Sequence, residues 1–185
     1  KALGELKAVE ANDRLLKFAR DPNPAMRRPA LAALARIASP RSFATLTEAA
    51  KAANFRYEPA NAVGALLEYA DQLRRNGALV TSERACRLVM KSIDDDGRLP
   101  TRAAALAILA NARGVAAMPD LLTAIDHADR GYRNAALLSA ERIRGAAPIS
   151  RWVAKAQKVD AERRAEIVAM LGRQGDARAL PFIRT

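Results

Sequence analysis

The sequence predicts an all-α protein, an α-solenoid of about five stacked antiparallel helix pairs that occupies residues 1–185 as a single domain. Half of the 185 residues are hydrophobic but only 4% are aromatic, so the strong helix formers alanine and leucine make up most of the apolar content. Similar segments recur along the chain, as they do in helical-repeat proteins. No stretch approaches the roughly 18 uninterrupted apolar residues of a membrane span, and the length suits one domain.

The first segment, Leu3 to Ala19, is amphipathic. Because the exposed ends of a solenoid need a covering helix, we expect this segment to close the N-terminal end. The apolar residues available for packing are Leu6, Val9, Leu15, Leu16 and Phe18.

The first helix pair follows a short turn. Apolar residues at steps of three predict a helix over residues 28–37, for which Asn23 is a suitable N-cap and Pro24 a suitable first-turn residue. Pro29 lies inside this helix and should kink it, because proline removes one backbone hydrogen bond. The second helix of the pair is expected to begin after Pro40.

One sequence element returns several times at a spacing of roughly 31 residues. Arg27-x-x-Ala30-Leu31-x-x-Leu34 recurs as Arg102-x-x-Ala105-Leu106-x-x-Leu109, as Arg133-x-x-Ala136-Leu137 and, more weakly, as Arg163-x-x-Glu166-Ile167-x-x-Met170. At these residues the sequence resembles HEAT repeats, particularly the short bacterial form grouped with the phycobilin-lyase-type repeats. The resemblance covers about residues 21–185 and implies antiparallel helix pairs with a concave and a convex surface. The second repeat, Glu58 to Ile93, is longer and lacks the arginine, so we expect the superhelix to be distorted there.

The later helices are separated by short connections, which make the pairs antiparallel. Gly114, Gly145 and Gly175 each suit a helix C-terminal cap. Pro119 and Pro181 suit the first turn of a helix, where a missing N–H costs nothing, and so mark the starts of two second helices.

Residues that carry catalysis are scarce. The only histidine, His127, is expected at the end of a helix as a cap or turn residue, and the only cysteine, Cys86, as a core residue. Trp152 is also expected in the core. One cysteine excludes an internal disulfide, and one cysteine with one histidine excludes zinc sites built from these residues. We therefore expect no enzyme activity, no catalytic residue, no metal and no cofactor.

The recurring arginine opens four of the first helices (Arg27, Arg102, Arg133 and Arg163). Asp21 and Asp96 precede two of these arginines by a similar interval. We interpret the pattern as a structural Asp–Arg ladder that ties one repeat to the next, in preference to a ligand contact.

The chain is strongly basic. Its 31 Lys and Arg residues against 20 Asp and Glu residues give a net charge of +11, which favours polyanionic partners or simply keeps the protein in solution. Both helix sets carry net positive charge, so the sequence does not predict a continuous basic stripe. The few aromatic residues argue against binding of single-stranded nucleic acid.

These observations favour a non-enzymatic scaffold that binds a protein or peptide partner, or neighbouring domains of its parent chain, through its concave face. Two alternatives remain: binding to the backbone of duplex nucleic acid, with the architecture of the HEAT-like DNA glycosylases, and a bilin-lyase-like enzyme, implied by the resemblance alone. The chain starts at Lys1 and ends on a partial helix at Thr185, so we expect it to be part of a longer, bacterial-type protein, and its compartment and oligomeric state stay open. The residues expected to line the concave face are those of second helices that point away from the core, namely Glu48, Lys51, Arg87, Lys91, Thr123, Asp126, Arg151, Lys155 and Lys158.

Overall fold

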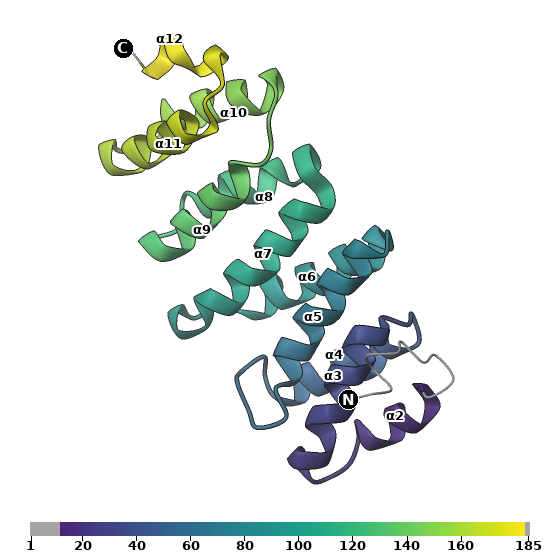
Figure 1. The fold of residues 1–185 in the computed structure, drawn as a ribbon. Helices are drawn as coiled ribbons and strands as arrows, with labels where there is room; N and C mark the ends of the chain where they lie inside the picture. The colour runs from purple at the N-terminus through teal and green to yellow at the C-terminus, as the bar shows by residue number, and fades with distance from the viewer. Residues whose placement is uncertain (1–11, 184–185) are drawn as a thin grey trace. The chain divides into compact units, whose positions relative to one another are not determined.

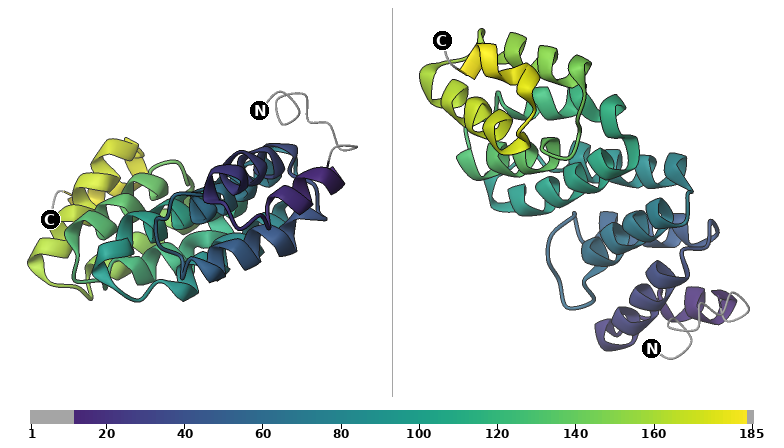
Figure 2. Two further views of the ribbon diagram at one scale, coloured as in Figure 1. Left: turned by 90° about the horizontal axis from the view of Figure 1, so that it is seen from below. Right: turned by 45° about the horizontal axis from the view of Figure 1, so that its top comes forward.

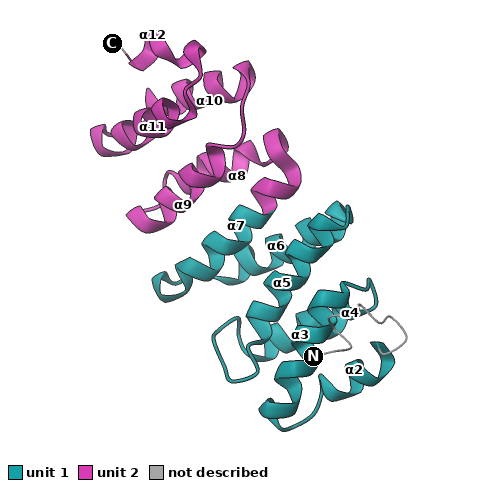
Figure 3. Ribbon diagram, in the orientation of Figure 1, with its two compact units in different colours: residues 1–108 teal, residues 109–185 magenta. Residues whose placement is uncertain are grey.

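The computed structural model describes residues 12–183, and the chain divides into two compact units, unit 1 (residues 1–108) and unit 2 (residues 109–185) (Figure 3). Over the described residues the chain forms helices and turns with no strand. The predicted fold class, an all-α solenoid, is confirmed. Each unit is built from helices that pair in opposite directions (Figure 1).

Unit 1 contains two complete helix pairs preceded by one short helix. The short helix packs against the first pair. The opening helix of that pair also packs against the opening helix of the second pair. The elements are α2 (Asn12–Phe18), α3 (Pro24–Ile37), α4 (Ser42–Ala52), α5 (Ala62–Arg75) and α6 (Leu79–Ser92), followed by a 3₁₀ turn (Asp96–Arg98) and the beginning of α7 (Leu99–Arg113).

The first pair begins as the sequence predicts. The Asn23 side chain accepts a hydrogen bond from the backbone N–H of Ala25 (2.9 Å), and Pro24 is the first residue of α3. The helix continues through Pro29 and ends at Ala38, whose backbone is left-handed (φ 52°). Asn23 is therefore confirmed as the N-cap of this helix.

The helix α2 covers the outer side of the first pair in unit 1. It packs against α3 and α4, and the Ser42 hydroxyl donates a buried hydrogen bond to the side-chain Oδ1 of Asn12 (3.0 Å). Leu15 is buried, whereas Phe18 is 47% exposed. Leu3, Leu6 and Val9, the other part of the predicted covering segment, lie outside the described residues.

The core of unit 1 consists of leucines and alanines with one tyrosine. Tyr69 is fully buried, and its hydroxyl donates a hydrogen bond to the backbone carbonyl of Ser39 (3.0 Å), which joins α5 to the end of α3. Ser82 on α6 donates to the carbonyl of Ala70 on α5 (2.7 Å). Both hydroxyls therefore enter the core with their polar atoms bonded.

Unit 2 contains the end of α7, then α8 (Met118–Ala124), α9 (Arg130–Ala140), α10 (Ala146–Ala156), α11 (Ala161–Gln174) and α12 (Leu180–Ile183). The first helices α9 and α11 lie side by side (Figure 2). Trp152 on α10 is fully buried, which confirms its predicted place in the core. Pro119 and Pro181 are each the second residue of their helix, as predicted.

The glycines between helices meet the prediction in two of three cases. Gly114 (φ 52°) follows α7, and Gly175 (φ 65°) is the C-cap of α11. The prediction for Gly145 is wrong, because α9 already ends at Glu141 and Gly145 stands directly before α10. Its φ of 130° turns the chain into the next helix.

The segment Asp96–Ala124 is long and apolar enough to pass as a membrane span by length and hydropathy. In the structure it comprises the two helices α7 and α8, which are separated at Gly114 by a short 3₁₀ stretch. Leu106 on α7 and Leu121 on α8 are fully buried. Burial in a helical core therefore accounts for part of the apolar composition of this segment.

Two of the recurring arginines bond the turn that precedes their own helix. Arg27 donates from Nη1 to the carbonyls of Asp21 (3.0 Å) and Pro22 (2.9 Å), and Arg133 donates from Nη1 to the carbonyls of His127 (3.2 Å) and Ala128 (2.7 Å). The structural interpretation of these residues is confirmed. The expected role of the Asp21 carboxylate is wrong, since it accepts the N–H of Asn23 while its backbone carbonyl bonds the arginine.

Candidate partner-binding groove

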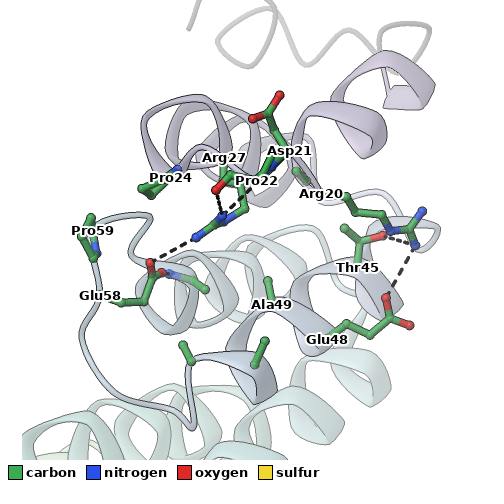
Figure 4. Close-up of a pocket in the computed structure, with 14 residues that line it drawn as sticks. Arg20, Asp21, Pro22, Pro24, Arg27, Thr45, Glu48, Ala49, Glu58 and Pro59 are labelled. Carbon is green, nitrogen blue, oxygen red and sulfur yellow. Dashed lines mark hydrogen bonds and ion pairs between the residues drawn. The ribbon is translucent and has the colours of Figure 1, made fainter.

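Unit 1 contains a groove of about 780 Å³ between the turn that leads into α3, the helix α4 and the loop that leads into α5 (Figure 4). We call it the α4 groove. Its lining residues are mostly small or apolar, with charged residues at both ends. They are Ala19, Arg20, Asp21, Pro22, Pro24, Arg27, Thr45, Glu48, Ala49, Ala52, Ala53, Glu58, Pro59 and Ala62.

Alanine and proline make the middle of the groove. Ala49, Ala52 and Ala53 stand on one side of α4 and its C-cap, and Ala62 begins α5. Because an alanine side chain ends at Cβ, this side of α4 leaves an open apolar space that a larger residue would fill. The sequence thus produces the groove by placing small residues on the outward side of a second helix.

An exposed ion pair lies at one end of the groove. Arg20 Nη2 lies 3.6 Å from Glu48 Oε2, and both side chains are well exposed. The same Nη2 approaches the hydroxyl of Thr45 at 3.4 Å. A pair with this exposure contributes little to stability, so either side chain can turn toward a bound molecule.

The opposite end of the groove is more firmly held. Besides its two carbonyl bonds, Arg27 places Nη2 3.9 Å from Glu58 Oε2. The Glu58 carboxylate also accepts the backbone N–H groups of Ala60 (2.7 Å) and Ala62 (2.9 Å) at the start of α5. This network fixes the loop against the first helix pair.

The loop over residues 53–61 forms the wall of the groove and has an uncommon backbone. Asn54, Phe55 and Asn61 are all left-handed (φ 48°, 52° and 52°), which is rare for a residue as bulky as phenylalanine. Phe55 is nevertheless buried, and its N–H bonds the carbonyl of Ala50 (2.9 Å). Burial of this ring therefore holds the loop in its strained course.

A second hollow, of about 550 Å³, lies along the same loop and is lined by Arg56, Tyr57, Asp95, Gly97 and Arg98. Arg98 Nη1 donates to the carbonyl of Asn54 (2.7 Å), and hydrogen bonds from the same arginine lower the pKa of Asp95. Tyr57 is 78% exposed. The loop is thus anchored by an arginine on this side as well, with an exposed tyrosine between the two anchors.

The four expected partner-binding residues of unit 1 lie on its second helices. Glu48 lines the α4 groove, and Lys51 is exposed one turn further along α4. Arg87 and Lys91 are exposed on α6. Of these four residues, Glu48 is the one that the groove includes.

The other five expected residues lie in unit 2, on or directly after α8 and α10. Lys155 Nζ donates to Asp126 Oδ1 (2.6 Å), and Thr123 donates its hydroxyl to the carbonyl of Pro119 (2.9 Å). Arg151 and Lys158 are exposed. The nine residues therefore divide between the two units.

Sequence reasoning missed Arg20, Arg27, Glu58 and Tyr57 as residues beside a groove. Arg27 was interpreted as part of a structural ladder, which its carbonyl bonds support. The available signal was the long second repeat, which begins at Glu58 inside the loop over residues 53–61. A longer connection between otherwise regular repeats is a place where binding residues concentrate.

His127 and Cys86 are the two residues whose side chains could act as a base or a nucleophile, and both have the contacts of structural residues. His127 Nδ1 accepts the backbone N–H of Asp129 (3.0 Å), and its ring packs edge-on against Tyr132, so its predicted role in a turn is confirmed. Cys86 is fully buried, and burial raises its thiol pKa to about 12. Among the described residues there is no group of three His, Cys, Asp or Glu side chains placed to hold a metal ion.

Comparison with known families gives one result for this chain. The family described as HEAT repeats matches residues 1–76, which include the first helix pair, the loop over 53–61 and α5. No curated protein sequence matches the chain. The match bears out the predicted resemblance to HEAT repeats over residues 1–76, and the antiparallel helix pairs agree with it.

Proposed function

We propose that the protein is a non-enzymatic scaffold that binds a protein or peptide partner, and that the α4 groove receives an extended segment of that partner. HEAT-repeat proteins are generally scaffolds, commonly for other proteins. The observation that carries the proposal is a groove of about 780 Å³ with an alanine and proline lining between two charged ends.

The lining favours a peptide. Alanines and prolines offer apolar contact for one or two side chains, while Arg20 and Glu48 at the open end can bond peptide backbone or polar side chains. The volume falls within the range of roughly 300 to 1,000 Å³ that is typical of ligand sites. The charges of the groove are already engaged with each other or with backbone, so binding needs no buried unpaired charge.

The firm end of the groove supports the same proposal. Arg27 and Glu58 hold the loop wall in place through bonds to three different segments of unit 1. A wall that is ordered before binding costs less entropy when the partner arrives. The eight expected residues outside the groove are proposed to extend the contact along the second helices.

The test is to fill the groove without disturbing the core. Ala52 lines the groove and is exposed, whereas Ala44 is exposed on the same helix and does not line it. A displayed library of random peptides is selected on the wild-type chain, and the affinity of a selected peptide is measured by fluorescence anisotropy. Ala52→Trp should weaken binding by roughly tenfold or more, and Ala44→Trp should leave it unchanged.

Two results would contradict the proposal. The first is that no peptide is enriched on the folded chain. The second is that a selected peptide binds equally well to the Ala52→Trp variant, which would place its site away from the groove.

A further inference from the structure

Charge pairing differs in degree between the two sets of helices in unit 1, since Arg28 on the first helix α3 also has no acidic partner among the described residues. On the first helices, Arg36 lies 3.2 Å from Glu68, and both Arg74 and Arg75 lie 2.8 Å from Asp71. On the second helices, Lys51 and Lys91 have no acidic partner among the described residues. Both helix sets carry net positive charge. A count of residues does not show, however, that some of the positive charge on α4 and α6 has no acidic partner in the described part of the chain.

Three cations share one side of α6. Arg84, Arg87 and Lys91 follow one another at helical spacing on α6 and are all exposed. The Arg84 guanidinium lies 4.7 Å above the ring of Phe43 on α4, so α4 and α6 approach each other at this point. We call the surface formed by Lys51, Arg84, Arg87 and Lys91 the basic face of unit 1.

The acidic residues of these two helices are few and engaged. Glu48 pairs with Arg20, and Glu83 pairs with Arg87 at 2.8 Å. Unit 2 shows the same pattern independently, since α10 contains no acidic residue and Arg151 and Lys158 have no acidic partner within its described part. In unit 2 this pattern is confined to α10 and the residues directly after it, because α8 carries Asp120 and no basic residue.

We propose that the basic face of unit 1 binds an acidic segment of the partner protein, next to the apolar segment that enters the α4 groove. This inference rests on the proposed function and adds the chemistry of the partner. Lys51 joins the two surfaces, because it stands on α4 between Glu48 and Ala52, which both line the groove. Glutamate or aspartate side chains would complete the charges that Lys51 and Lys91 lack, and the complementary potential would also speed encounter.

A protein segment fits the basic face better than duplex nucleic acid does. The adjoining groove is apolar, and apolar side chains that could fill it occur in a peptide and not in a phosphate backbone. Glu48 and Glu83 also interrupt the face, and a row of phosphates would meet these carboxylates at close range.

The experiment compares three labelled probes at about 150 mM salt, where charges beyond roughly 8 Å are screened. The probes are a peptide in which Glu alternates with Leu and Pro, its counterpart with Gln for Glu, and a short DNA duplex. The Glu peptide should bind at least roughly tenfold more tightly than the Gln peptide. The double variant Lys51→Glu/Lys91→Glu should remove that difference.

The matched control is Lys17→Glu/Arg28→Glu, which has the same net charge. Both residues are exposed in unit 1 and belong to α2 and α3, not to α4 or α6. Circular dichroism verifies that both double variants are folded. The control should keep the preference for the Glu peptide, because the effect depends on the position of the charges.

Three outcomes would overturn the inference: equal binding of the Glu and Gln peptides, equal loss in both double variants, or tighter binding of the duplex than of the Glu peptide at this salt concentration. If Ala52→Trp still abolishes binding of a library-selected peptide, the groove proposal survives and the acidic-partner inference alone fails. If Ala52→Trp has no effect while the charge variants behave as expected, the groove proposal fails and the basic face remains.

Discussion

Arg133 and Glu166 form a buried, two-pronged ion pair between the first helices α9 and α11. Arg133 Nε donates to Glu166 Oε2 and Nη2 to Oε1, both at 2.8 Å, and the two side chains are only 3% and 7% exposed. Glu166 occupies the place that Ala30, Ala105 and Ala136 hold in the other copies of the repeated element. The weakest copy of the element therefore supplies the counter-charge for the arginine of the copy before it.

Truncation of Arg133 should be more damaging than truncation of its partner. Arg133→Ala leaves the Glu166 carboxylate buried without its main donor, and we expect a loss of about 3 kcal/mol in the free energy of unfolding. Glu166→Ala should cost less, because Arg133 keeps Glu162 (2.8 Å) and the carbonyls of His127 and Ala128. Urea denaturation of both variants and of the double variant measures the difference, and equal, small losses would show that the pair is not structural.

Acid should weaken the same contact. Hydrogen bonds from Arg133 lower the pKa of Glu166 from its ordinary value of 4.5, although burial acts in the opposite direction. Since the folded pKa lies below the unfolded one, the stabilisation is complete above the unfolded pKa and is lost as the pH falls through the folded value. The free energy of unfolding of the wild type should therefore decline as the pH falls below 4.5, with a shallower decline in Glu166→Gln. The same decline in both proteins would assign the acid sensitivity to other carboxylates.

Backbone conformation offers a stabilising substitution at the end of α3. Ala38 is left-handed (φ 52°), a conformation that costs alanine roughly 1 to 2 kcal/mol and glycine very little. We expect Ala38→Gly to raise the free energy of unfolding by about 0.5 to 1 kcal/mol after the entropy cost of glycine. The control is Ala53→Gly at the end of α4, where φ is −79° and glycine should destabilise. Thermal or urea unfolding measures both, and a loss at position 38 would refute the strain argument.

The thiol of Cys86 should be inert in the folded protein. It is fully buried, and burial raises its pKa to about 12, so the reactive thiolate is rare near neutral pH. Ellman's reagent should react with it slowly in buffer and rapidly in concentrated urea. Fast reaction of the native protein with Ellman's reagent would contradict this expectation and make Cys86 a candidate nucleophile.

The sequence predicted the parts of the fold that depend on local rules. The N-cap at Asn23, the first-turn prolines Pro119 and Pro181 and the buried Trp152 all follow from short-range spacing. Gly145 was misplaced because a glycine between two helices can end one or precede the next, and the sequence alone does not distinguish the two positions.

The groove was not predictable in the same way. It depends on the loop over residues 53–61, whose left-handed Phe55 has no local sequence signal and is held by burial of its ring. The pairing of charges also depends on three-dimensional neighbours such as Arg36 and Glu68. Residue counts therefore gave the sign of the net charge of each helix set but missed which cations lack a partner.

Titration of the isotopically labelled chain with a library-selected peptide, followed by NMR, tests the binding proposal most directly. The account predicts that the largest amide shifts occur at Lys51, Ala52, Ala53 and Ala62, around the α4 groove, and that in Ala52→Trp they require a roughly tenfold or greater excess of peptide. Shifts confined to first helices such as α9 and α11, or the same shifts in the Ala52→Trp variant, would contradict it.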